Sequence, residues 1–285
     1  MRRVGIVAKP DAPHAPEVIA RLVDWLTQRG REVTLEKETA GIVPAVNVPA
    51  ANKAELPGLS DLIIVLGGDG TLLSMARAVG DLGVPLLGVN LGGLGFLTAT
   101  TLDEMLPSLD AALEGRMVIE ERLMLAARVL RNGAVVCEHI ALNDVVITKS
   151  AMSRIINLAV SVEGQYATAY RADGLIISTP TGSTAYSLSA GGPIVAPSVE
   201  ANVLTPICSH TLTNRPIVVP ASHRIEVTIQ SYQEIMLTLD WQVGVGLRER
   251  DVVQVVKATA RIRLIRFPQK DFFNVLRTKL KWGER

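Results

Sequence analysis

A single carboxylate among glycines is the feature of this sequence best suited to chemistry. Residues 67–71 read Gly-Gly-Asp-Gly-Thr and follow the apolar run 63–66 directly. This pattern predicts a buried strand, a tight turn and a helix start, at the strand end where open α/β sheets bind ligands. A helix start favours an anion such as phosphate. Asp69 would then hold a metal or take a proton from a hydroxyl that attacks phosphorus, or it would simply cap the helix.

A second glycine-rich run follows another short apolar segment. Residues 85–89 predict a buried strand, and residues 90–97 read Asn-Leu-Gly-Gly-Leu-Gly-Phe-Leu. The spacing is not that of a dinucleotide-binding G-x-G-x-x-G motif, and the chain has no Walker A lysine. Two glycine loops at the ends of neighbouring strands would form the walls of one crevice. A ligand role is therefore favoured over a flexible loop.

The third feature is a turn rich in hydroxyl groups. Six hydroxyl side chains fall within residues 178–186, after a predicted strand at 175–178. Ser183 is placed to cap a short helix over 184–188, and the ring of Tyr186 could stack on a base or a nicotinamide. A solvated turn is the alternative, but the polar density beside an aromatic ring favours ligand contact.

Weaker candidates lie elsewhere in the second half of the chain. The pair Asn143-Asp144 offers donor and acceptor atoms that suit a ribose diol or an amide, although such a pair is also common in a turn before a strand. Arg154, Arg171 and Arg215 could each donate two hydrogen bonds to a phosphate, or could be solvated or paired within the protein.

The elements that must position these residues form two kinds of pattern. Up to residue 115, apolar strand runs alternate with helical periodicity, including a strand at 4–8 and helices at 17–29 and 102–113. This alternation predicts a parallel sheet with helices on its faces, a Rossmann-like α/β domain over 1–115. Residues 40–60 receive no assignment.

From residue 116 the pattern changes to short alternating runs separated by turn residues. It predicts an antiparallel β-sandwich domain over 116–267, so the fold class is α/β plus all-β. The C-terminal segment, 268–285, contains a helical pattern at 270–281 that we expect to pack back on the first domain.

Composition excludes several kinds of partner and site. The 285 residues include 29 basic and 28 acidic side chains, for a formal charge of +1, so nothing indicates a nucleic-acid or membrane partner. The two cysteines and four histidines have no disulfide or zinc-binding pattern. The apolar run at the N-terminus is too short for a signal peptide or an anchor. We therefore expect a cytoplasmic protein.

Together these motifs resemble those of bacterial NAD kinases, the ATP-NAD kinase family. The matching segments occur in the family's order at 67–71, 142–144, 173–193, 206–212 and 215–216, and the similarity extends from Val4 to Trp282. Lipid kinases and phosphofructokinases have turns like 67–71. The hydroxyl-rich run 178–186 is the discriminating part.

The resemblance implies a reaction and a set of site residues. The reaction is the Mg²⁺-dependent transfer of the γ-phosphoryl group of ATP to the 2′-hydroxyl of the adenosine ribose of NAD, giving NADP. Asp69 corresponds to the proton acceptor, while metal ligands are not assigned. A homo-oligomer, a dimer or tetramer in which a neighbouring subunit completes the site, is also implied. The dinucleotide contacts would be Asp69, Gly70, Phe96, Asn143, Asp144, Arg154, Arg171, Asp173, Thr181, Thr184, Ala185, Tyr186, Ser187, Leu188, Ser189 and Gln242.

The chain departs from the family's pattern at three of these places. Many relatives have a glutamate where Asp144 stands, and some have a histidine at the position of Arg154. The common Asp-Gly-Gln reads Asp240-Trp241-Gln242 here, and a Trp does not readily adopt the positive φ that glycine allows.

Two other functions fit parts of the pattern. A non-catalytic NADP(H)-binding sensor would use the same scaffold, but would have no need of Asp69 as a base. A kinase acting on a lipid or a sugar would share the glycine turn but would leave the run 178–186 unexplained.

Overall fold

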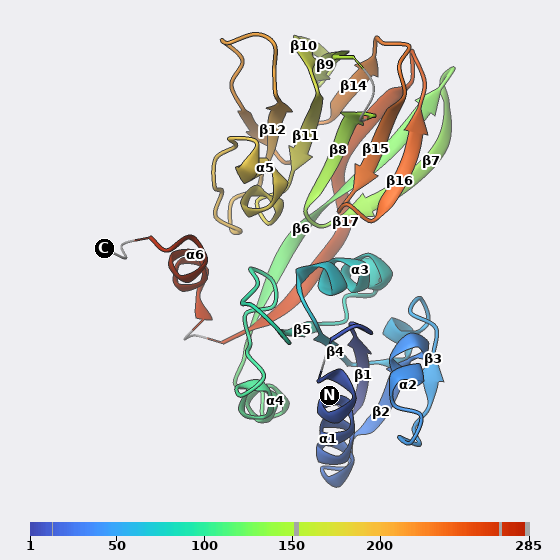
Figure 1. The fold of residues 1–285 in the computed structure, drawn as a ribbon, viewed down its shortest axis with the longest axis vertical. Coiled ribbons are helices and arrows are strands. Elements are labelled where there is room, and N and C mark those ends of the chain that lie inside the picture. Colours follow the sequence, from blue (N-terminus) through green and yellow to red (C-terminus); the bar gives the residue numbers. More distant parts are fainter. Residues whose placement is uncertain (13, 151–153, 268–269, 283–285) are drawn as a thin grey trace. The chain divides into compact units, whose positions relative to one another are not determined.

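The computed structural model describes residues 1–12, 14–150, 154–267 and 270–282. The chain divides into two compact units (Figure 1). The first contains Met1–Glu121 and Ala260–Arg285, and the second contains Arg122–Thr259. Two long strands, β6 (Val118–Arg131) and β17 (Val252–Arg266), include the points of division. Of the predicted C-terminal segment, residues 268–269 and 283–285 lie outside the described residues.

The first unit is built on a parallel sheet, as the alternating pattern predicted. Its strand order is β5-β4-β1-β2-β3, and Leu264 at the end of β17 pairs in parallel with Leu86 of β5. Every residue of the central strand β4 is buried, as expected for a parallel strand covered on both faces. The strands are β1 (Arg3–Ala8), β2 (Glu32–Glu36), β3 (Ala50–Ala51), β4 (Leu62–Leu66) and β5 (Leu86–Val89).

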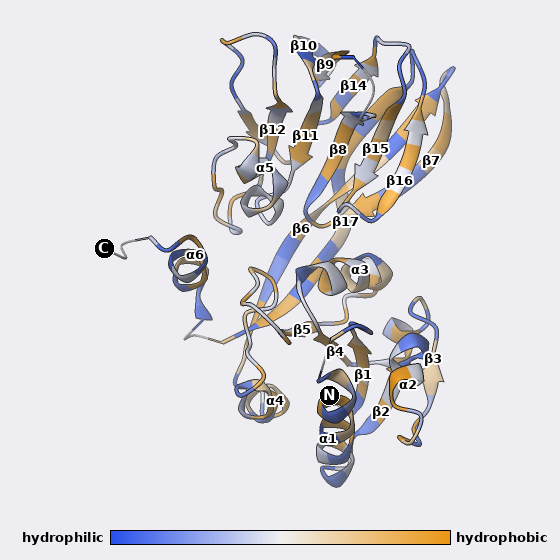
Figure 2. Cartoon of the chain, in the orientation of Figure 1, coloured by the Kyte–Doolittle hydropathy of each residue, from blue (hydrophilic) through white to orange (hydrophobic). Residues whose placement is uncertain are grey.

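The longer helices of this unit each bury an apolar face. In α1, Ile19, Leu22 and Leu26 are fully buried at helical spacing, and Figure 2 shows both hydrophilic and hydrophobic residues along this helix. The unassigned residues 40–60 contain the end of α2, all of β3 and a 3₁₀ turn at Leu56–Leu59. The helices are α1 (Ala15–Gln28), α2 (Lys37–Ile42), α3 (Asp69–Val79), α4 (Met105–Leu113) and α6 (Phe272–Leu280).

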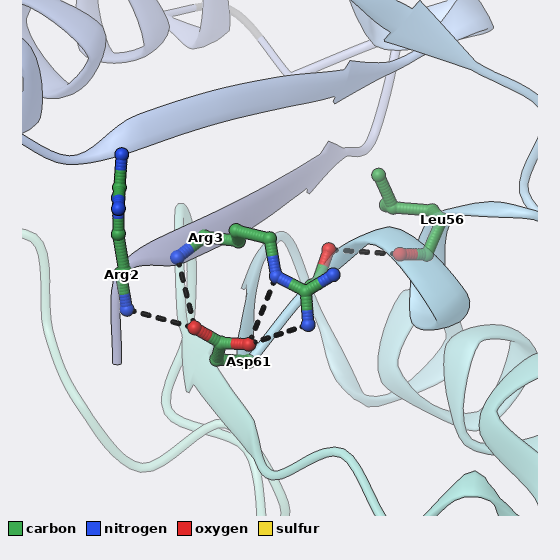
Figure 3. Close-up of polar contacts among 5 residues, drawn as sticks. Arg2, Arg3, Leu56 and Asp61 are labelled. Atoms are coloured by element: carbon green, nitrogen blue, oxygen red, sulfur yellow. Dashed lines mark hydrogen bonds and ion pairs between the residues drawn. The ribbon is translucent and has the colours of Figure 1, made fainter.

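Asp61 ties the starts of the two central strands together. Its carboxylate accepts hydrogen bonds from the backbone N–H groups of Arg2 (2.8 Å) and Arg3 (3.0 Å) and from the Arg3 guanidinium (Figure 3). The hydrogen bonds from Arg3, backbone and side chain, hold the pKa of Asp61 well below its usual range. Because β1 and β4 are thus aligned at their starts, with Val4 opposite Leu62, their carboxyl ends lie side by side.

The second unit has two antiparallel arrangements of strands, which confirms the predicted antiparallel fold. One sheet has the order β13-β12-β11-β8-β15-β16, and the other follows β10-β9-β14-β17, with β6 and β7 paired beside it. One apolar core takes side chains from both, such as Ile177 of β11 and Leu158 of β9. The remaining strands are β7 (Ala134–Ala141), β8 (Asp144–Lys149), β9 (Ile156–Val162), β10 (Gln165–Ala172), β11 (Gly174–Ser178), β12 (Ala201–Ile207), β13 (Ile217–Pro220), β14 (Ile225–Ile229), β15 (Ile235–Leu239) and β16 (Val243–Leu247).

A short helical segment follows β11 in the second unit. It consists of a 3₁₀ turn at Gly182–Thr184 and helix α5 (Tyr186–Ser189). Across the described ranges, none of the helices is both long enough and apolar enough to span a membrane.

Candidate active site

The glycine turn joins β4 to α3 as the sequence predicted. Gly67 donates its N–H to the carbonyl of Val89 (2.9 Å), which fixes the turn against the neighbouring strand. Gly68 is the N-cap of α3, and Asp69 is the first residue of that helix, with no side-chain cap. The alternative in which Asp69 only caps the helix is therefore wrong.

The Asp69 side chain binds the second glycine loop instead. Its carboxylate accepts hydrogen bonds, each 3.0 Å long, from the N–H groups of Phe96, Leu97 and Thr98 and from the Thr98 hydroxyl. A Cβ on Gly95 would lie 2.1 Å from Asp69 Oδ1, so only glycine fits there. The two glycine loops thus meet around one carboxylate.

Phe96 is held from both its backbone and its ring. Its carbonyl accepts a hydrogen bond from the Arg266 guanidinium (2.8 Å). The Lys279 ammonium of α6 lies 5.9 Å from the centre of the Phe96 ring. The C-terminal helix therefore packs on the first unit, beside the loop that holds Asp69.

A cavity of about 360 Å³ opens beside the start of α3. Lys9, at the end of β1, and Lys53 line it together with Gly68 and Thr71, and Glu36 and Glu38 also face it. Lys53 donates a 3.5 Å hydrogen bond to Ser74 Oγ in α3. Two lysines near a helix start suit an anion. Neither lysine was among the predicted site residues, although a lysine directly after the first predicted strand was an available signal.

In the second unit, Asn143 and Asp144 stand at the start of β8 beside the β15–β16 turn. The Asp240 carboxylate accepts hydrogen bonds from the N–H groups of Leu142 (3.1 Å), Asn143 (2.8 Å) and Asp144 (3.3 Å). Asp144 is itself fully buried. Burial, and then the charge of Asp240, raises the pKa of Asp144 to about 7.

The hydroxyl-rich turn packs directly on Asn143. Thr179 donates its hydroxyl to the Leu142 carbonyl (2.7 Å) and its N–H to the Asn143 carbonyl (2.9 Å). A Cβ on Gly182 would lie 2.1 Å from the Asn143 carbonyl oxygen. Close backbone contact therefore brings this turn, which carries the predicted contacts Thr181 and Thr184, onto the Asn143-Asp144 pair.

Two hydroxyls of this turn point inward rather than toward a ligand. Ser183 donates to the Pro180 carbonyl (2.6 Å) and accepts from the Val195 N–H (2.9 Å), so it does not cap the helix as predicted. Ser187 is fully buried and shares a 2.8 Å hydrogen bond with Thr205. These two side chains stabilise the turn that presents Tyr186.

Several buried oxygens near this turn lack a protein partner. Ser178 lies directly opposite Asp144 across the β11–β8 pairing. Ser178 Oγ, both carboxylate oxygens of Asp144 and the Asn143 Oδ1 are buried without a hydrogen bond. Buried polar atoms are normally paired, so these oxygens suit a ligand that supplies donors, such as the hydroxyls of a ribose.

The turn between β15 and β16 keeps a left-handed backbone in spite of its Trp. Asp240 has φ +48° and Trp241 has φ +58°, and Gln242 donates its N–H to the Leu239 carbonyl (3.0 Å). Trp241 contacts Tyr186 edge-to-face, with ring centroids 5.0 Å apart. The departure from glycine therefore adds an aromatic contact without opening the turn.

A basic pocket of about 610 Å³ gathers two of the predicted arginines. Its lining includes Lys149, Arg154 and Arg171, and Lys149 Nζ lies 3.7 Å from the Asp173 carboxylate. The third candidate, Arg215, instead donates to the carbonyls of Leu212 (2.7 Å) and Asn214 (2.8 Å) in its own loop.

The predicted contacts thus fall into two groups, each within one unit. Asp69, Gly70 and Phe96 belong to the first, and the others, from Asn143 to Gln242, belong to the second. The glycine turn carries a carboxylate at the end of a parallel sheet, and the antiparallel unit offers ribose-type and phosphate-type contacts. The fold and these sites are those of a two-domain, nucleotide-dependent kinase.

Comparison with known proteins gives the family. The ATP-NAD kinase N-terminal domain matches residues 4–117, and the ATP-NAD kinase C-terminal domain matches residues 142–267. The chain belongs to the ATP-NAD kinase family, whose reaction is the ATP-dependent phosphorylation of NAD. The match goes against the alternative of a lipid or sugar kinase.

Individual relatives are similar over their full length. The chain is 49% identical to the NAD kinase of Geotalea daltonii over 286 residues and 51% identical to that of Syntrophotalea carbinolica over 287 residues, with complete coverage of both chains in each case.

Solved structures show the same fold. A yeast NADH kinase complexed with NADH has a TM-score of 0.92 at 27% identity, covering all of this chain and 89% of the other. An NAD kinase from Archaeoglobus fulgidus in complex with ATP has a TM-score of 0.79 at 26% identity, covering 98% of each chain.

Proposed function

We propose that this chain transfers the γ-phosphoryl group of ATP to the 2′-hydroxyl of the adenosine ribose of NAD, with Asp69 as the proton acceptor. The observation that carries the proposal is the Asp69 carboxylate, fixed at the glycine turn by three backbone N–H groups and one hydroxyl. A ribose hydroxyl is a weak nucleophile, so a positioned carboxylate must take its proton as it attacks.

The step balances without any further reactant. The ribose oxygen forms a bond to the γ-phosphorus while the bond from that phosphorus to the bridging oxygen breaks. The bonding pair leaves with ADP, and the hydroxyl proton goes to Asp69. Such a transfer depends on positioning and on neutralising charge rather than on covalent chemistry by the protein.

The phosphates of ATP would occupy the cavity beside the start of α3. Lys9 and Lys53 supply positive charge there, and the dipole of the 11-residue helix α3 favours an anion at the same end. Glu36 also lines the cavity, but its carboxylate already accepts hydrogen bonds from Thr39. Gly68 and Gly70, the neighbours of Asp69 in the glycine turn, line this cavity.

Mg²⁺ fits this site as an ion held mainly by the substrate. The described ranges contain no group of three or more His, Cys, Asp or Glu side chains that could hold a metal. Magnesium is commonly held by one or two carboxylates together with substrate phosphates, so the phosphates of ATP would supply most of its ligands. When bound, the ion would neutralise charge on the phosphates of ATP.

NAD would contact the remaining predicted residues, most of them in the second unit. The orphaned oxygens of Asn143 and Asp144 support ribose binding, Arg154 and Arg171 support binding of a phosphate group, and Tyr186 offers a ring for stacking. The proposed set also includes Asp69, Gly70, Phe96, Asp173, Thr181, Thr184, Ala185, Leu188, Ser189 and Gln242, while the buried Ser187 supports the turn from within.

A coupled assay for NADP tests the reaction. Purified protein receives NAD, ATP and Mg²⁺, with parallel reactions that each lack one of the three. We expect NADP only in the complete mixture, and we expect Asp69→Asn to lower kcat by about a hundred- to ten-thousand-fold. If Asp69→Asn turns over at the wild-type rate, another group must accept the proton.

The same assay separates the enzyme from the sensor. A sensor would give no NADP in any mixture but would still bind NADP in a calorimeter. Neither product nor binding would mean that the ligand itself has been misidentified.

We further propose a cytoplasmic homo-oligomer. Both cysteines are free in the structure, which supports a reducing compartment. Ile217 and Val218 are exposed on β13, an edge strand of the six-stranded sheet, and an exposed apolar edge favours pairing with another chain. Light scattering coupled to gel filtration would give a dimer or tetramer mass, and a monomer at micromolar concentration would contradict it.

A further inference from the structure

The two oxygens of the Asp69 carboxylate are held unequally. Among the described residues, Oδ1 accepts three hydrogen bonds, from the Leu97 N–H, the Thr98 N–H and the Thr98 hydroxyl. Oδ2 accepts one, from the Phe96 N–H. A carboxylate oxygen has about two lone-pair sites, so Oδ1 is saturated while Oδ2 retains room for one more donor.

The hydroxyl of Thr98 has its direction set by Asn90. Thr98 Oγ1 lies 3.0 Å from Asn90 Nδ2, which can only donate. A hydroxyl carries a single hydrogen. Because the amide of Asn90 already donates to Oγ1, the Thr98 hydrogen is left for Asp69 Oδ1.

The orientation of the Asn90 amide is fixed in turn by the loop. Its Oδ1 accepts a 2.6 Å hydrogen bond from the Gly92 N–H, and a flipped amide would place two donors against each other there. Asn90 and Thr98 are both buried, with exposed fractions of 6% and 0%. Water does not compete for these groups, so the chain of hydrogen bonds from Gly92 to Asp69 has one direction.

Packing locks the Thr98 side chain as well. A Cβ on Gly88 would lie 2.9 Å from the Thr98 methyl, and a Cβ on Gly95 would lie 2.3 Å from its hydroxyl. Two glycines thus make room for each branch of this threonine, and its rotamer has little freedom.

We propose that Thr98, oriented by Asn90, is a positioning residue that turns Oδ2 of Asp69 toward the substrate as the proton-accepting atom. The proposal rests on the proposed role of Asp69. It adds that the second glycine loop sets which carboxylate oxygen reacts, and that the hydrogen bond from the Thr98 hydroxyl is part of the machinery for phosphoryl transfer.

The test compares Thr98→Val, Thr98→Ser and Thr100→Val in the NADP assay. Valine keeps the shape and the methyl but loses the hydroxyl. A hydrogen bond to a charged group is worth enough to predict that kcat falls by roughly 10- to 100-fold, with KM for NAD and for ATP unchanged within about twofold. Thr98→Ser, which keeps the hydroxyl, should retain most of the turnover. Thr100→Val, a buried threonine two residues on, should match wild type.

A second variant, Asn90→Asp, should reverse the direction in which the Thr98 hydroxyl donates its hydrogen. In Asn90→Asp the new carboxylate would accept the Thr98 hydrogen and withdraw it from Asp69, so kcat should fall. Adding Thr98→Val to Asn90→Asp should cost little more, because both changes remove the same hydrogen bond. This variant keeps the proposal testable if Thr98→Val fails to fold.

The outcomes separate the two proposals. If wild type forms no NADP, the proposed function fails. If wild type is active, the positioning role is overturned by any of three results: unchanged kcat in Thr98→Val, equal loss in Thr98→Ser, or losses that add in the double variant.

Discussion

The ring of Trp241 meets the ring of Tyr186 edge-on, with centroids 5.0 Å apart and planes inclined by 64°. Trp241 holds this contact from a left-handed backbone position, φ +58°, which costs a non-glycine residue roughly 1–2 kcal/mol. Tyr186 follows the hydroxyl-rich turn and is a predicted dinucleotide contact. The strained Trp is thus packed against the ring that we expect to meet the ligand.

We predict that Trp241 fluorescence reports NAD binding. A base stacked on Tyr186 would change the surroundings of the exposed indole beside it. Adding NAD should change the emission of wild type and should change that of Trp241→Phe much less, because Trp25 and Trp282 lie in the other unit. ATP without NAD serves as the control. An equal change in Trp241→Phe would place the ligand away from this pair.

Gly95→Ala should lower activity through crowding of the proposed base. The new Cβ would lie 2.1 Å from Asp69 Oδ1 and 2.3 Å from the Thr98 hydroxyl, so the carboxylate must move. Misplacement of a reacting group by about 1 Å can cost about a hundredfold in rate, and we expect a loss of kcat of that order. Gly93→Ala is the matched control, because its Cβ would meet nothing within 4 Å. Similar kcat values in the two variants would contradict a role for this close contact.

Asp144→Asn should stabilise the protein relative to wild type as the pH rises. The pKa of Asp144 is raised from 3.8 to about 7 in the folded state, so between these values the folded state holds a proton that the unfolded state has lost. The contribution of Asp144 to the free energy of unfolding therefore falls as the pH rises from about 4 to about 7, and it stays low above pH 7. Asparagine has no charge to bury, so the Tm difference between variant and wild type should grow over that interval.

We predict that Asp251→Asn changes Tm in the opposite direction to Asp144→Asn. Burial opposes its ionisation, but hydrogen bonds from Arg131 (2.7 and 2.9 Å) and from the Arg248 N–H outweigh burial and leave its pKa below the usual range. Asp251→Asn should therefore destabilise the protein at neutral pH, and its deficit should shrink as the pH falls. A Tm difference for Asp144→Asn that does not depend on pH would show that Asp144 titrates normally.

Lys9→Met should weaken ATP binding selectively. Lys9 lines the cavity beside α3, and loss of a charge-assisted hydrogen bond to a phosphate predicts an increase of about tenfold in KM for ATP, with KM for NAD changed little. Lys37→Met is the control, since Lys37 is exposed and does not line that cavity. An increase in KM for NAD alone would show that the phosphates of ATP bind outside this cavity.

The sequence by itself determined that an α/β domain precedes an antiparallel β domain, and it determined where the glycine turn lies. Apolar runs alternating with helical periodicity predict βα units, and short alternating runs predict antiparallel strands, because both patterns are set by residues near in the chain. The turn at 67–71 and the run 178–186 were readable for the same reason, since their glycine, proline and hydroxyl residues act on local backbone.

The tertiary structure alone decided what these residues contact. Asp69 reaches N–H groups 27–29 residues away, and Asp240 reaches Leu142, Asn143 and Asp144 across 96–98 residues. Such partners depend on which loops the sheets bring together. The burial of a side chain likewise depends on residues from distant parts of the chain that pack against it. For this reason the Ser183 hydroxyl donates to the Pro180 carbonyl instead of capping the helix. For the same reason the sequence carried no signal of the raised pKa of Asp144.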